Sequence, residues 1–65
     1  MNIGYAQGMN TQLTISQLIE GDKVFRRGQV RMVSSVVVLG RTTDVAFTDG
    51  TKWFAISDTP AFIKE

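Results

Sequence analysis

Two runs of alternating polar and apolar residues meet at Asp49-Gly50, within the stretch FTDGTKWF of residues 47–54. Asp-Gly between such runs is a strong signal for a β-hairpin, because tight hairpin turns need positive φ angles that Gly adopts readily. The chain is therefore constrained to pair these two runs antiparallel. The register of the pairing decides whether Trp53 lies in the core or on the surface.

Two registers fit this hairpin. A two-residue loop pairs Val45 with Phe54 and turns Trp53 outward. A three-residue loop with a bulge at Gly50 pairs Val45 with Trp53 and turns Phe54 outward, because a slip of one residue exchanges the faces of a strand. We favour the two-residue loop, since Phe54 together with Ile56 is a better apolar partner for Val45 than Trp53 is.

Strand signals separated by turn residues continue through the rest of the chain from residue 23. The expected strands are 23–27, 29–39, 42–47, 51–56 and 61–65, with a tight turn at 57–60. The run 29–39 becomes apolar on both faces, so we expect it to bend at Ser34-Ser35 and to change the face that it buries. A strongly bent second strand is what a small closed barrel needs.

The residues before the first strand show other signals. Residues 13–21 contain capping residues and a closing Gly, which predict a short helical turn. Residues 1–12 are rich in Gly, Asn and Gln and have no period, so we expect a flexible N-terminal arm. The predicted organisation is an arm over 1–12 and one barrel domain over 13–65, with the barrel itself over 22–64.

A family resemblance supports this architecture. The segments LIEGDKV, GQVRMV and VAFTDGT resemble the small SH3-like, Tudor-like domains that are common in bacteria and their phages, and the likeness covers residues 18–64. It implies an all-β, five-stranded SH3-like barrel in a small accessory protein of phage or mobile-element type. Because members bind RNA, DNA, peptides or each other, it implies a binding module without naming the ligand.

A core follows from these expected strands and their alternation. We predict that the following residues are buried: Ile15, Leu18, Val24, Val30, Met32, Val36, Val38, Val45, Phe47, Phe54, Ile56 and Phe62.

The composition argues against catalysis. Among the 65 residues there is no Cys and no His, which removes disulfides, thiolate metal sites, the commonest metal ligand and Ser-His or Cys-His nucleophiles. The six glycines are scattered at turns rather than gathered in a phosphate-binding loop. We therefore expect no enzymatic activity, no cofactor and no metal.

The first candidate site is a surface for a protein partner or for a second copy of the chain. With the two-residue loop, Trp53 would be exposed beside Asp44, Ala46 and Lys52. Aromatic residues are enriched in interface cores, and a domain this small gains stability from a partner. The competing interpretation is that Trp53 belongs to the core or is covered by another part of the chain.

The second candidate site is an alternative function, nucleic-acid binding. Five basic residues occur with no acid among them: Lys23, Arg26, Arg27, Arg31 and Arg41. Together with a stacking Trp53 they would bind phosphates and a base. The net charge of only +1 argues against binding by the whole surface. The competing interpretation is that these are solvated charges on outward strand faces.

The sequence contains no apolar stretch approaching the roughly 18 residues that a membrane span needs. Its first residues, MNIGYAQGMNTQ, have neither a positive charge nor an apolar run, so no signal peptide is expected. We expect a cytoplasmic protein with no membrane contact.

Overall fold

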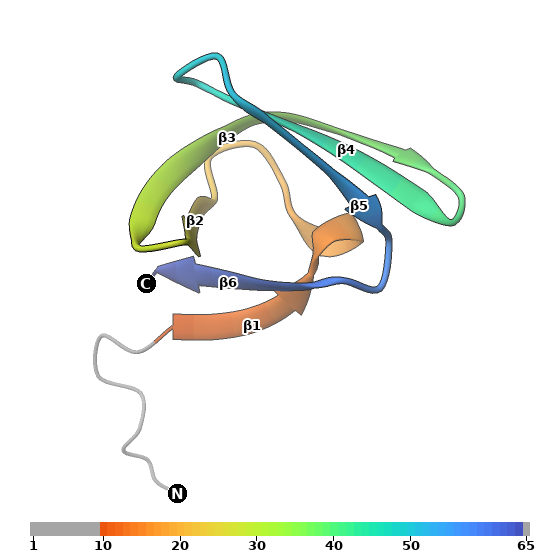
Figure 1. The fold of residues 1–65 in the computed structure, drawn as a ribbon, viewed down its shortest axis with the longest axis horizontal. Coiled ribbons are helices and arrows are strands. Elements are labelled where there is room, and N and C mark those ends of the chain that lie inside the picture. The colour runs from red at the N-terminus through yellow and green to blue at the C-terminus, as the bar shows by residue number, and fades with distance from the viewer. Residues whose placement is uncertain (1–9, 65) are drawn as a thin grey trace, which may run out of the picture.

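The computed structural model describes residues 10–64 as one antiparallel β-sheet with a short helical turn (Figure 1). In chain order the elements are β1 (Asn10–Thr14), the 3₁₀ helix η2 (Ile15–Gln17), β2 (Lys23–Arg26), β3 (Gln29–Leu39), β4 (Thr42–Phe47), β5 (Lys52–Ile56) and β6 (Pro60–Lys64). The prediction of an all-β fold is confirmed.

The sheet is not closed into a barrel by hydrogen bonds. The order of the described strands is β1-β6-β2-β3-β4-β5, so β1 and β5 are the two edges. β1 is a sixth strand that the sequence did not predict, and it pairs with β6 from Asn10 opposite Lys64 to Thr14 opposite Pro60. Of the arm predicted over 1–12, residues 10–12 thus belong to a strand, and residues 1–9 lie outside the described residues.

Strand β3 carries the curvature of the sheet. Figure 1 shows it rising from the β2 side and arching over the interior toward β4, with η2 near the end of β5. Its register against β4 shifts between Val33 and Ser35, which makes Ser34 the extra residue of a β-bulge. The Ser34 hydroxyl donates to the carbonyl of Ala46 over 3.0 Å. The predicted bend at Ser34-Ser35 is confirmed.

The helical turn predicted before the first barrel strand is confirmed as η2. The Thr14 amide donates to the Gln17 side-chain oxygen (2.9 Å), which caps the turn. The Ile15 amide donates to the Thr59 carbonyl (2.8 Å) and docks the turn onto the chain just before β6. Ile15 is fully buried and belongs to the core.

The core is smaller than predicted. Its buried apolar side chains are Ile15, Leu18, Val24, Val33, Val45, Phe47 and Ala61. Five of these were predicted, while Val33 and Ala61 were not. Val36 is only half-buried. The prediction was wrong for Val30, Met32, Val38, Phe54, Ile56 and Phe62, all of which are exposed.

Two physical reasons explain four of these six errors, those at Val30, Met32, Phe54 and Ile56. Before the bulge the odd residues of β3, such as Val33, face inward, whereas after it the even residue Val36 does, so a single alternation cannot hold for the whole strand. The exposure of Phe54 and Ile56 instead follows from the register of the next hairpin.

Candidate functional site

The β4–β5 hairpin has a three-residue loop. The Phe47 amide donates to the Thr51 carbonyl (2.9 Å), and the Gly50 amide donates to the Phe47 carbonyl (3.0 Å). Gly50 has φ 90°, in the left-handed region that favours glycine. Val45 therefore lies opposite Trp53. The favoured two-residue loop is wrong, and the bulged alternative is the register of the molecule.

Trp53 consequently lies on the inner face of the sheet. Its side chain is half-buried and packs against the core. The guanidinium of Arg26 covers the indole, with Cζ 4.2 Å from the ring centroid, which is the geometry of a cation–π contact. Trp53 therefore does not share a surface with Asp44, Ala46 and Lys52, because those three residues lie on the outer face.

Phe54 takes the place on the outer face that was expected for Trp53. Two rows of paired residues cross β3, β4 and β5 there, Val37–Asp44–Phe54 and Leu39–Thr42–Ile56. The four large apolar side chains of these rows are exposed by 51% (Val37), 58% (Leu39), 60% (Phe54) and 65% (Ile56). We call this surface the Phe54 face. Ala46 and Lys52 form its next row.

The sequence gives a partial indication that this face is apolar. The end of β3 is apolar at every position from Val36 to Leu39, so one side of it had to be exposed unless the strand was covered on both faces. For Phe54 no such signal existed, since either register gives its strand an apolar inner face.

A second apolar group lies on the outer face of β6, β2 and β3. It consists of Phe25, Val30, Met32 and Phe62, whose exposed fractions are lower, from 39% to 47%. Phe25 lies opposite both Val30 and Phe62, which makes the group continuous. Unlike the Phe54 face, it does not reach the β5 edge of the sheet.

Three of the five basic candidates gather with Trp53. Arg26 is in contact with the indole and close enough to Arg27 and Arg31 to feel their charges. We call Arg26, Arg27, Arg31 and Trp53 the arginine–tryptophan cluster. Lys23 lies at the other end of β2, opposite Met32, and Arg41 lies in the β3–β4 turn. The five basic residues therefore do not form one patch.

Asp49 is the acidic neighbour of this cluster. Its carboxylate accepts bonds from the Thr51 hydroxyl (2.6 Å) and amide (2.9 Å) and pairs with Arg31 at 3.0 Å. These bonds, the two from Thr51 first, lower the pKa of Asp49 below its usual value. The Arg31–Asp49 pair is the one salt bridge among residues 10–64, and it fixes the β4–β5 turn against β3.

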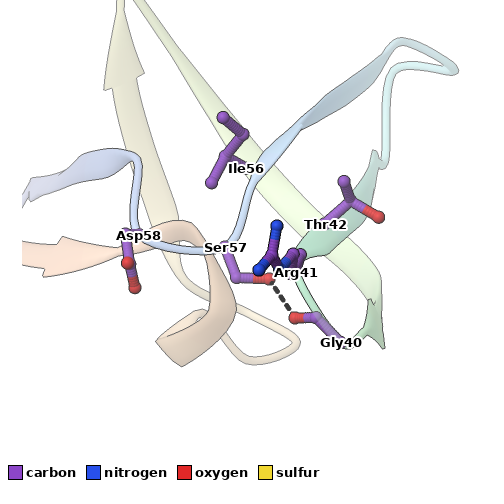
Figure 2. Close-up of a pocket in the computed structure, with 6 residues that line it drawn as sticks. All are labelled: Gly40, Arg41, Thr42, Ile56, Ser57 and Asp58. Atoms are coloured by element: carbon purple, nitrogen blue, oxygen red, sulfur yellow. Dashed lines mark hydrogen bonds between the residues drawn. The ribbon is translucent and has the colours of Figure 1, made fainter.

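A pocket of about 660 Å³ lies where the β3–β4 turn meets the end of β5 (Figure 2). Its lining is Gly40, Arg41, Thr42, Ile56, Ser57 and Asp58. Ser57 organises it, since the Ser57 hydroxyl donates to the Gly40 carbonyl (2.7 Å) and the Ser57 amide to the Arg41 carbonyl (2.7 Å). The pocket has a charge of each sign, from Arg41 and Asp58, at its border.

Within the part of the chain that the structure describes, no three side chains of the metal-binding types come together. No helix among the described residues has the length and apolar character needed to cross a bilayer. No protein-family model matches this chain, and comparisons with curated proteins and with solved structures find no match either.

Proposed function

We propose that this protein is a non-catalytic binding module that acts through self-association, with the Phe54 face as the interface. The observation that carries the proposal is that Val37, Leu39, Phe54 and Ile56, each more than half exposed, lie on one face of the sheet, on either side of Asp44 and Thr42. Monomeric soluble proteins rarely expose large continuous apolar patches, and those they do expose are commonly interaction sites. Covering this surface removes four large apolar side chains from water.

The charges on the Phe54 face suit a second copy of the chain. Asp44 lies between Val37 and Phe54, and Lys52 lies one row away on the same face. In a two-fold symmetric dimer each surface meets itself, so Asp44 of one copy is available to Lys52 of the other, twice. Burying a carboxylate without such a counter-charge would be costly, whereas this arrangement supplies one.

The second part of the proposal concerns the type of fold. We propose that residues 18–64 are an open form of the SH3-like arrangement, in a small accessory protein of phage or mobile-element type. Support comes from the strand order β6-β2-β3-β4-β5, in which four strands follow one another as hairpins and the last returns beside the first. The long bent β3, shared between the two halves of the sheet, supports it as well.

The test is the mass of the protein in solution as a function of concentration, measured by sedimentation equilibrium. We expect the mass to rise from that of the 7.2 kDa chain toward twice that value. Ile56→Asp should abolish the rise. Ile19→Asp is the matched control, because Ile19 is equally exposed, at 65%, but lies in the loop before β2 and outside the Phe54 face.

Charge reversal then separates self-association from binding to some other protein. Asp44→Lys and Lys52→Asp should each weaken the dimer, and the double variant should restore it, because the pair between copies forms again with its charges exchanged. A wild-type mass that stays monomeric at every concentration would overturn self-association and leave a different protein as the partner of this face.

A further inference from the structure

The arginine–tryptophan cluster holds a guanidinium in a fixed orientation. The Arg26 guanidinium lies over the indole of Trp53, with Cζ 4.2 Å from the ring centroid, and Trp53 itself packs against the core. The N–H donors of a guanidinium lie in the plane of the group, so a cation held over a ring by its charge keeps donors available for a ligand. Because Trp53 already fixes its orientation, little side-chain freedom is lost when those donors bind a planar or tetrahedral oxyanion.

Arg27 occupies a position that arginine does not favour. The pairing of Arg26 with Gln29 leaves Arg27 and Gly28 as a two-residue loop, with φ 54° and φ 78°. Such a type I′ turn favours Asn, Asp or Gly at its first position. Among the described residues Arg27 is the one non-glycine residue with a positive φ. Residues that break a local rule are concentrated at functional sites.

The cluster is short of negative charge. Among residues 10–64 Asp49 pairs with Arg31, and neither Arg26 nor Arg27 forms a salt bridge. The pKa of Arg26 is lowered, first by burial and then by repulsion from Arg27 and Arg31. An anion bound between Arg26 and Arg27 would relieve that repulsion.

We propose that the arginine–tryptophan cluster binds the phosphate backbone of a nucleic acid, through Arg26 and Arg27. Arginine forks fit phosphate oxygens in pairs, and the tip of a hairpin presents them to a long chain of phosphates. Trp53 is a positioning residue here, because Arg26 and the core occupy its surroundings, which argues against the base-stacking role first considered for it. Binding should therefore be independent of base sequence.

The test is fluorescence anisotropy of a labelled mixed-sequence DNA duplex, titrated with the full chain from about 20 mM to about 200 mM NaCl. Two phosphate contacts predict a slope of log K against log salt of about −1.8. Arg27→Asn should weaken binding by about five-fold or more at the lowest salt and reduce the slope by about 0.9. The same variant should not lower the urea midpoint of unfolding, since Asn suits the turn.

Arg41→Asn is the matched control. It makes the same change of charge in another two-residue hairpin loop, away from the cluster, and binding should stay within two-fold of wild type, roughly the screened effect of one distant charge. No binding at the lowest salt, or equal losses for the two variants, would overturn the proposal. Displacement of the duplex by inorganic phosphate, beyond the effect of sodium chloride at equal ionic strength, would also overturn it and assign the cluster to a small free anion.

Discussion

At the scale of single residues, Thr43 and Ser57 tie the β4 strand to the turn after β5. Thr43 is fully buried, and its hydroxyl lies 2.8 Å from that of Ser57. The Ser57 proton is committed to the Gly40 carbonyl, which can only accept, so Thr43 must be the donor to Ser57. The β3–β4 turn and a buried hydroxyl are thus both bonded to one half-buried serine.

Ser57→Ala should therefore be costly for so small a change. It leaves the Thr43 hydroxyl and the Gly40 carbonyl without their partner, and an unsatisfied buried group costs about 1–3 kcal/mol. Urea unfolding followed by Trp53 emission measures the loss. In a Thr43→Val background the buried donor is already gone, and the same substitution should cost less. An equal loss in both backgrounds would mean that the hydroxyl pair contributes nothing.

The Asp49 carboxylate makes stability depend on pH in the acid range. Its pKa in the folded protein is below the usual 3.8, because the ionised form accepts bonds from Thr51 and Arg31. A depressed folded pKa gives stability that is present above about pH 4 and is lost as pH falls through the folded value. We expect the urea midpoint of wild type to fall more than that of Asp49→Asn between about pH 7 and pH 2.5. Parallel curves would contradict this role.

At the scale of elements, the turns and bends were predictable and the register of one hairpin was not. Asp49-Gly50 marked the hairpin and Ser34-Ser35 marked the bend, because turn and bulge chemistry is local. The register depends on contacts between distant parts of the chain, such as Arg31 with Asp49 and Arg26 with Trp53. No local pattern contains those pairs.

Because this register could not be predicted, the residues of the candidate surfaces could not be predicted fully either. Asp44, Ala46 and Lys52 share an outer face, but their aromatic neighbour is Phe54, because the three-residue loop moves Trp53 inward. The basic stretch could not be resolved from the sequence either. The turn at Arg27-Gly28 sets which arginines meet, while Lys23 lies at the other end of β2 and Arg41 lies in the β3–β4 turn.

Replacing Trp53 or Phe54 by Ala should lower the free energy of unfolding by different amounts, because the first faces inward and the second outward. Trp53→Ala removes a half-buried ring that contacts the core, and we expect a loss of about 2 kcal/mol, below the range for fully buried aromatics. Phe54→Ala removes an exposed ring and should cost less than about 1 kcal/mol. Urea unfolding by far-UV circular dichroism compares the two without relying on the indole. The reverse order would favour the two-residue loop.

At the scale of the whole molecule, the described part of the chain has more exposed large apolar side chains than buried ones. Seven apolar side chains form the core, while ten large ones are exposed among residues 10–64. A domain of this size has a narrow stability margin, and a partner subunit is one of the few supports open to a chain without Cys or His. The proposed association at the Phe54 face would account for both features together.

Thermal unfolding should therefore depend on concentration. If the dimer forms through the Phe54 face, mass action raises its Tm as the protein is concentrated. Calorimetry over a hundred-fold range of protein concentration is sufficient to detect the shift. A saturated dimer gains about 2.7 kcal/mol of stability over that range. Ile56→Asp should give a constant Tm, and Ile19→Asp should behave as wild type does. A Tm for wild type that does not move with concentration would contradict a dimer in equilibrium with its monomer.

Both proposed surfaces depend on the register of β4 against β5, and one measurement tests it directly. Asp44 and Phe54 form a pair without mutual hydrogen bonds, in which the Cα atoms approach to about 4.5 Å. A two-dimensional NMR spectrum should therefore contain a strong Hα–Hα contact between Asp44 and Phe54. That contact would place Phe54 outward and Trp53 beneath Arg26. A strong Hα–Hα contact between Val45 and Phe54 in its place would show the other register, and both surfaces described here would be wrong.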